Sequence, residues 1–135
     1  MSGWDDYYLG MKYSWSFCFS EENMKTFSSL SGDYHPIHLN KSFARSKGFD
    51  APIIYGLLLS SQMSRLIGEE LPDKNAILTG IKMDFMHPCL PNDSLTFHAE
   101  LTDKSDAASF IEFDCKIHNN DVISARGKVN AVWKP

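Results

Sequence analysis

The feature that most constrains this chain is an uninterrupted helical pattern over residues 53–70. No proline interrupts it, and its apolar side chains recur at helical spacing at Leu57, Leu58, Met63, Leu66 and Ile67. A helix that spans a membrane needs about 20 mostly apolar residues. This segment instead carries several serines, a glutamine and an arginine. We therefore expect one buried helix, with the rest of a globular protein folded around it.

The size and composition of the chain are those of an ordinary globular protein. It has 135 residues, of which 43% are hydrophobic and 22% charged. We expect a single domain over residues 1–135, large enough to form a core without disulfides or a metal. The net charge of −4, without any stretch that concentrates Lys and Arg, argues against a nucleic-acid-binding protein. Small-molecule or protein partners are favoured.

The cysteines and the N-terminus indicate a reducing compartment. Cys18, Cys89 and Cys115 are odd in number and have no CxxC spacing, so neither a disulfide framework nor a zinc site is expected. Each is expected to behave as a small apolar residue. The first residues include Asp5 and Asp6 and lack a basic segment followed by an apolar run. We therefore expect a cytoplasmic protein without a secretory signal.

Two short helices and a strand are predicted before the long helix. Residues 12–19 alternate, which predicts a half-buried strand with Tyr13, Trp15, Phe17 and Phe19 on one face. Ser20 is a plausible N-cap for a helix that Gly32 ends. The apolar stripe of that helix is expected to be Met24, Phe27 and Leu30. Asn40 is expected to cap a second helix over residues 41–47, which Gly48 terminates.

After the long helix the pattern becomes that of strands separated by turn residues. The expected strands cover residues 76–86, 94–102, 108–118 and 122–133. Together with the first strand they predict an α+β fold, in which a curved antiparallel sheet of about five strands wraps around the 53–70 helix. The two shorter helices form an overhang. Such a sheet leaves open edges, so we expect a homodimer or a dimer of dimers.

The loop over residues 32–38, GDYHPIH, brings titratable groups to the start of the buried helix. It places one carboxylate and two imidazoles in a segment broken by glycine and proline. Loops that carry such groups next to a rigid element are common locations of functional residues. This loop is therefore the first candidate for a functional site.

Two segments, residues 27–49 and 51–68, resemble the signature of the MaoC-like, R-specific enoyl-CoA hydratases of the hotdog superfamily. That signature runs Ser-Gly-Asp, two residues, Pro-x-His, a short helix that ends in Gly-Phe, then Pro-Ile-x-His-Gly and a long helix. A weaker pattern of the family, F-x-x-P-x-x-P-x-D, is similar to residues 85–93, FMHPCLPND. The resemblance implies the hotdog fold, which agrees with the architecture expected from the residue patterns.

The resemblance also implies roles for individual residues. Asp33 and His38 match the catalytic Asp and His of the family. Gly56 matches the glycine whose N–H binds the thioester carbonyl, and Ser64 matches a serine that supports the catalytic pair.

Three positions depart from the family pattern. His35 stands where Asn is usual, Asn40 where Asp is common, and Tyr55 where a His precedes the glycine. The first two departures concern substrate preference, and the third adjoins the site for the carbonyl. The residues expected to contact substrate are His35, Pro52, Ile53 and Tyr55.

The activity implied is hydration of a trans-2-enoyl-CoA to an (R)-3-hydroxyacyl-CoA, without a metal or another cofactor. A carboxylate and an imidazole on one loop can hold a single water, so that one removes a proton and the other supplies one to carbon. Gly56, at the start of a helix, offers an N–H without a helical acceptor to a developing oxyanion.

Structural interpretations of the same residues stay open. Asp33 can be an Asx-turn residue, His38 a core histidine, and Ser64 a serine bonded to its own helix. Gly56 can relieve crowding between helix and sheet, and Tyr55 can be a packing residue. The remaining histidines, His87, His98 and His118, have no ligand spacing and are assigned no role.

Two other functions remain alternatives at this point. One is a hotdog module that binds an acyl thioester or another partner without turnover. The other is a dehydratase that acts on a substrate bound to a carrier protein. Thioesterase activity is less favoured, because an Asp and a His five residues apart suit hydration better than hydrolysis.

Overall fold

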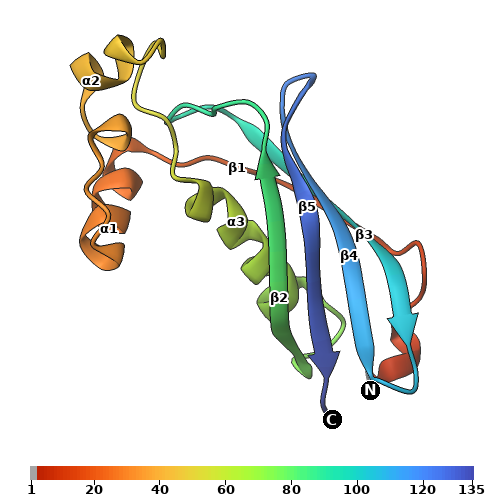
Figure 1. Ribbon diagram of the computed structural model, residues 1–135. Helices are drawn as coiled ribbons and strands as arrows, with labels where there is room; N and C mark the ends of the chain where they lie inside the picture. The colour runs from red at the N-terminus through yellow and green to blue at the C-terminus, as the bar shows by residue number, and fades with distance from the viewer. Residues whose placement is uncertain (1–2) are drawn as a thin grey trace.

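The computed structural model describes residues 3–135 and shows one five-stranded antiparallel sheet, curved around a helix (Figure 1). The spatial order of the strands is β1-β3-β4-β5-β2. Their bounds are β1 Lys12–Phe17, β2 Ala76–Phe85, β3 Leu95–Ser105, β4 Phe110–Asn119 and β5 Val122–Trp133. The expected fold class is confirmed. The first strand ends two residues earlier than predicted, and the Phe19 carbonyl instead accepts a hydrogen bond from Asn92 N–H at 2.7 Å.

The core lies between the concave face of the sheet and helix α3, Gly56–Arg65. Alternation along β4 turns Ile111, Phe113, Cys115 and Ile117 inward, and all four are buried. They belong to the same apolar cluster as Met63 of α3, which is fully buried. Each large apolar side chain buried in this way contributes about 1.5–3 kcal/mol.

The long helix predicted over residues 53–70 is wrong at its start and changes character at its end. Ile53 N–H donates to the Ile37 carbonyl at 3.1 Å and Ile54 N–H to the Cys89 carbonyl at 2.8 Å. These bonds to distant segments hold residues 53–55 outside the helix. At its other end α3 continues as a π-helical turn, η3, Leu66–Glu70. Within residues 3–135, no helix has the length and apolarity needed to cross a membrane.

The apolar stripe of α3 is rotated from the predicted one. Leu57 is 65% exposed, whereas Leu59, which the prediction omitted, is 4% exposed. Met63, Leu66 and Ile67 are buried as predicted. The spacing shows that one face is apolar, but the position of the sheet decides which leucine lies on that face.

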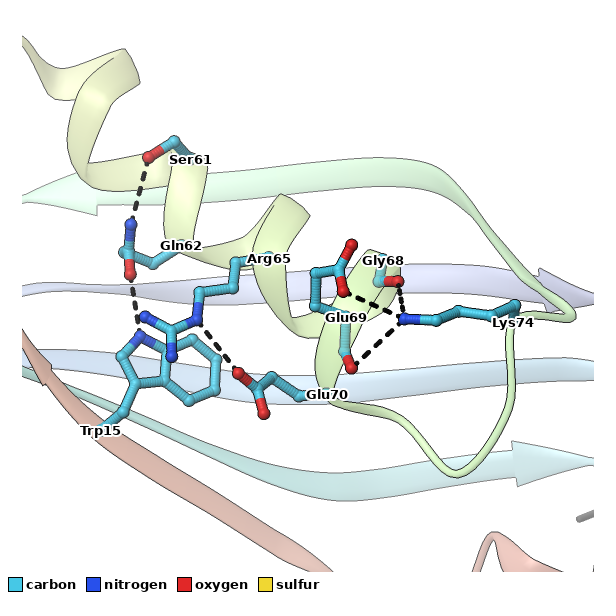
Figure 2. A network of polar contacts seen from close by, with 8 residues as sticks. All are labelled: Trp15, Ser61, Gln62, Arg65, Gly68, Glu69, Glu70 and Lys74. Atoms are coloured by element: carbon cyan, nitrogen blue, oxygen red, sulfur yellow. Dashed lines mark hydrogen bonds and ion pairs between the residues drawn. The ribbon is translucent and has the colours of Figure 1, made fainter.

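A polar network ties α3 and η3 to the first strand (Figure 2). Trp15 Nε1 donates to Gln62 Oε1 at 2.8 Å, and the Arg65 guanidinium lies 4.4 Å from the centroid of the Trp15 ring. Arg65 also pairs with Glu70 at 3.0 Å. The Lys74 ammonium donates to a main-chain carbonyl of η3 at 2.8 Å. The helix is therefore fixed by polar contacts as well as by its apolar face.

The overhang, which we define as residues 20–55, lies beside the sheet beyond the start of α3 (Figure 1). It contains α1, Glu21–Ser31, the single 3₁₀ turn η2, Pro36–His38, and α2, Lys41–Ser46. The predicted caps are confirmed, since Ser20 Oγ accepts from Asn23 N–H and Asn40 Oδ1 from Phe43 N–H. Gly32 ends α1 in the left-handed region at a φ of 80°. Leu30, however, is 82% exposed, because the last turn of α1 has no layer packed outside it.

The cysteines behave differently from one another. Cys89 and Cys115 are buried, and burial raises the pKa of the Cys115 thiol to about 12. Both fit the prediction of small apolar residues. Cys18 is exposed, so the prediction is wrong for that residue, which follows the end of β1.

A second polar cluster closes the far end of α3. The carboxylate of Asp73, just beyond η3, accepts hydrogen bonds from the Tyr7 hydroxyl at 2.8 Å and from Trp133 Nε1 at 3.0 Å. It also accepts from Asn75 N–H at 3.0 Å. Tyr7 follows the short N-terminal helix η1, Trp4–Asp6, so this carboxylate joins segments near both ends of the chain.

Candidate active site

The orientation of His38 is set by a main-chain carbonyl. His38 ends η2, and its Nδ1 lies 2.7 Å from the Ile53 carbonyl oxygen. A carbonyl oxygen only accepts, so Nδ1 carries the hydrogen, and Nε2 is the atom that can exchange a proton with a ligand. Nε2 has no hydrogen-bond partner among the described residues. The residue predicted to contact substrate, Ile53, therefore also holds the imidazole in place.

Tyr55 connects His38 with Asp33. Its ring stacks on the His38 ring with a centroid distance of 3.9 Å, and its hydroxyl donates to the Asp33 main-chain carbonyl at 2.6 Å. Burial, followed by the nearby negative charge of Asp33, raises the pKa of Tyr55, which favours the protonated, donating form. Tyr55 is only 2% exposed. The packing interpretation therefore applies to its ring, while its hydroxyl holds the loop and Tyr55 lines neither of the cavities beside His38.

The Asp33 carboxylate has free hydrogen-bonding capacity. Its Oδ1 accepts from His35 N–H at 3.0 Å, which is an Asx-turn contact, and Asp33 is exposed. Oδ2 has no partner within the part of the chain that the structure describes. Within the same residues, no hydrogen bond joins this carboxylate to the His38 ring. The Asx-turn interpretation is therefore correct for one oxygen and leaves the other available.

Gly56 is the first residue of α3, and its N–H finds no acceptor within residues 3–135. A helix N-terminus carries a partial positive charge, which favours a negative oxygen at this position. A Cβ at residue 56 would lie 2.8 Å from Cζ of Phe85, so the ring of Phe85 lies directly against this glycine. The interpretation that Gly56 relieves crowding between helix and sheet is therefore also correct. The crowding is at Cα, where a side chain would be attached, and it leaves the N–H free.

A cavity of about 310 Å³ adjoins His38 and Gly56, whereas Asp33 is not among its lining residues. Its lining includes His38, Ile53 and Gly56, together with Phe85 and His87. Apart from the two imidazoles it is mostly apolar, with Phe49, Ile54, Leu59, Met86, Pro88 and Cys89 as its remaining lining residues. His87 was not among the predicted site residues, although it lines this cavity. Its position within the FMHPCLPND motif is the signal that was available, because that motif leads β2 directly into this cavity.

The remaining predicted site residues do not line this cavity. Pro52 lines a second cavity that shares His38 with the first, whereas Asp33, His35 and Tyr55 line neither one. His35 is exposed, and its Nδ1 accepts from Ile37 N–H at 3.1 Å. Ser64 lies on the exposed side of α3 and has no hydrogen bond to Asp33 or His38 within residues 3–135. Its supporting role stays a prediction.

The arrangement can bind a carbonyl and move protons without a metal. Gly56 N–H can donate to an oxygen in the apolar cavity, where hydrogen bonds gain strength from the low dielectric. His38 Nε2 and Asp33 Oδ2 are the proton-exchanging atoms that have no protein partner. Across residues 3–135, no group of three His, Cys, Asp or Glu side chains is arranged to hold a metal ion.

Comparisons with known proteins identify the family. Residues 10–122 match the family model described as MaoC like domain. The chain is 36% identical over 94 residues to the (R)-specific enoyl-CoA hydratase of Aeromonas caviae, which covers 70% of each protein. It is 27% identical over 127 residues to the enzyme of the same name from Rhodospirillum rubrum, covering 93% of this chain and 88% of that one.

A solved structure supports the same relationship. The (R)-hydratase from A. caviae involved in PHA biosynthesis superposes with a TM-score of 0.88 at 28% identity, covering 95% of this chain and 98% of that one. The fold derived from the strand order is therefore the hotdog fold. On the family match over residues 10–122 and on this structural likeness, the chain belongs to the MaoC-like family.

Proposed function

We propose that this protein adds water to a trans-2-enoyl thioester to give an (R)-3-hydroxyacyl thioester, and catalyses the reverse dehydration. The observation that carries the proposal is the position of His38. A carbonyl fixes its ring through Nδ1, Nε2 is left without a partner, and the same cavity contains Gly56 with its free N–H. Two relatives named (R)-specific enoyl-CoA hydratase support the assignment.

The proposed reaction starts with the thioester carbonyl oxygen accepting the Gly56 N–H bond. This bond polarises the double bond and stabilises the enolate that forms when water attacks Cβ. A single donor of this kind is worth about 10²–10³ in rate. The mostly apolar lining of the cavity suits an acyl chain, and the ring of Phe85 against Gly56 limits its width at the carbonyl.

Proton transfer is assigned to the loop. The ionised Asp33 carboxylate only accepts, so it takes a proton from the attacking water. His38 acts in its imidazolium form: Nδ1–H stays bonded to the Ile53 carbonyl, and Nε2 donates its proton to Cα on the same face. The water has then supplied OH to Cβ, Asp33 holds the other proton of that water, and His38 has given its own proton to Cα. Transfer of the Asp33 proton to His38 through solvent restores both groups, and the net reaction is addition of one water.

The decisive experiment follows the ultraviolet absorbance of the enoyl thioester with crotonyl-CoA as substrate. We expect the wild type to bleach this absorbance, and Asp33→Asn and His38→Gln each to lose about 10²–10⁴ in kcat. The product should be the (R) enantiomer by chiral chromatography. Saturable binding of crotonyl-CoA without bleaching would instead identify a binding module.

Matched control variants are available on the same molecule. Asp50→Asn changes another exposed carboxylate of the overhang, and His98→Gln changes an imidazole on the outer face of the sheet. Neither residue lines the apolar cavity beside Gly56. Both should retain wild-type kcat. A loss in either control as large as in Asp33→Asn would assign the effect to the fold.

We also propose a homodimer formed through β2. This strand is at the edge of the sheet and pairs only with β5 in the part of the chain that the structure describes. Its large exposed apolar side chains are Ile77, Leu78, Ile81 and Phe85. An apolar edge of this length calls for a covering partner. Sedimentation should show a dimer, which Ile81→Lys weakens, and a monomeric wild type would overturn this proposal.

A further inference from the structure

A second cavity, of about 390 Å³, shares His38 with the cavity beside Gly56. Because His38 lines both, the two cavities adjoin at the imidazole. The second cavity has charged groups in its lining, which the first one lacks. Those charges are Lys25 from α1, Lys41 at the start of α2, Glu21 and Asp93.

The two carboxylates of this cavity have structural roles. Asp93 Oδ2 accepts from Leu90 N–H at 2.9 Å and from Asn119 Nδ2 at 2.9 Å, so it holds the turn before β3. Glu21 is in the first turn of α1, where the helix dipole favours a negative charge. Neither carboxylate therefore needs a lysine for its stabilisation.

Neither lysine is held in an ion pair within the described residues. The ion pairs found within 4.0 Å across residues 3–135 involve neither Lys25 nor Lys41. This holds although Glu21 lies four residues before Lys25 on the same helix, which is a favourable spacing for a pair. Both lysines are exposed. Two ammonium groups from separate helices thus line one cavity without being held in ion pairs, so both can contact an anion that enters it.

We propose that this second cavity receives the phosphopantetheine arm of the thioester carrier, and that Lys25 and Lys41 bind its phosphate. This inference rests on the hydratase function proposed above. The acyl end then occupies the apolar cavity, the thioester lies at His38 and Gly56, and the arm leaves towards the lysines. A lysine is a compact point charge suited to phosphate, and a charge-assisted bond to phosphate is stronger than a neutral one.

The phosphopantetheine arm is common to CoA and to acyl-carrier proteins. The two carriers differ beyond this phosphate, because CoA continues into a nucleotide with further phosphates. A comparison of both carriers with a thioester that has no phosphate therefore tests the lysines and identifies the carrier together.

The experiment measures kcat and KM for crotonyl-CoA, crotonyl-acyl-carrier protein and crotonyl-N-acetylcysteamine, which lacks phosphate. We expect Lys25→Ala and Lys41→Ala each to raise KM about threefold for both phosphate-bearing substrates, and the double variant about tenfold, as for exposed ion pairs. KM for the N-acetylcysteamine thioester and kcat for all three should stay unchanged. The wild-type ratio of kcat/KM for CoA and carrier protein identifies the carrier.

Lys47→Ala is the matched control, because Lys47 is an exposed lysine of the same overhang whose ammonium lies over the Phe43 ring at 5.5 Å. Its KM values should equal those of the wild type. Equal effects of the double variant on all three substrates, or no effect on any, would overturn the proposal.

A calorimetric titration with CoA itself separates this proposal from the hydratase function. If the wild type turns over none of the three thioesters, the hydratase function fails, yet the lysine site is still tested. Weaker CoA binding by the double variant than by the wild type supports the site. Equal binding, or no binding by the wild type, overturns it.

Discussion

Two aspartates, Asp33 and Asp73, lie near opposite ends of α3. Their carboxylates differ in the number of hydrogen bonds that they accept from the protein. Asp73, beyond η3, accepts hydrogen bonds from Tyr7, Trp133 and Asn75. Asp33, near the start of α3, is exposed, and its carboxylate accepts a single protein hydrogen bond within the described residues. A carboxylate whose two oxygens both accept hydrogen bonds from the protein stabilises the fold, whereas one with a free oxygen can bind a ligand.

The largest effect on kcat should come from removing the charge of Asp33, the carboxylate with a free oxygen. Asp33→Asn is expected to lower kcat for crotonyl-CoA by about 10²–10⁴, because an amide cannot take a proton from water. Its melting temperature should stay near that of the wild type, since the amide oxygen still accepts from His35 N–H. Calorimetry and the absorbance assay measure the two quantities. A large drop in melting temperature would show that Asp33 is structural, like Asp73.

At Asp73 we expect the reverse, a loss of stability with kcat unchanged. Asp73→Ala leaves Tyr7 and Trp133 without their acceptor, and should lower the free energy of unfolding by about 2–3 kcal/mol. Urea denaturation gives this value. The kcat of the folded variant should equal that of the wild type, because Asp73 lines neither cavity beside His38. A loss of kcat in fully folded protein would show that the two ends are coupled through α3.

A matched pair of tyrosine variants sharpens the comparison. Tyr55→Phe removes the hydroxyl bonded to the Asp33 carbonyl, and Tyr7→Phe removes the one bonded to the Asp73 carboxylate. Each should cost about 1 kcal/mol of stability. Only Tyr55→Phe should also lower kcat, by about fivefold, because the loop that carries Asp33 loses its attachment beside His38. Equal kcat values for the two variants would contradict a positioning role for Tyr55.

The smallest expected effect is the pH dependence of the stability that Asp73 contributes. Burial by itself would raise the pKa of Asp73, but hydrogen bonds from Asn75 N–H, Trp133 and Tyr7 together hold it below its ordinary value. Folding thus favours the carboxylate form. This stabilisation is present above the ordinary pKa of an aspartate, about 3.9, and is lost as the pH falls through the lower folded value.

The measurement is the melting temperature of the wild type and of Asp73→Asn between pH 7 and pH 3. The difference between the two proteins should be constant at neutral pH and shrink towards pH 3. A difference that grows as the pH falls would reverse the assigned direction of the pKa shift.

Local patterns predicted much of the fold correctly. Alternation identified the strands, and the caps at Ser20, Gly32 and Asn40 were correct, because a cap depends on hydrogen bonds within a few residues. The errors were at positions that distant segments control. The start of α3 depends on bonds to Ile37 and Cys89, and the exposure of Leu57 depends on where the sheet lies.

In the candidate site, too, some features depend on neighbouring residues and others on distant segments. Asp33, His38 and Gly56 are predicted as site residues from motifs in the sequence, and the structure adds how they are held. The Ile53 carbonyl orients the imidazole and the Tyr55 hydroxyl fixes the loop, neither of which has a signal in spacing. No cluster of Lys and Arg along the sequence suggested a phosphate site.

The sequence by itself therefore determined the periods of helix and strands, the caps and the chemical groups of the loop, because short-range hydrogen bonds and side-chain alternation are written in neighbouring residues. Only the tertiary structure decided that His38 lines two cavities and that Lys25 and Lys41, sixteen positions apart by their numbering, both line one of them. A cavity forms where segments distant in the chain pack together, so its lining depends on their packing and has no local signature.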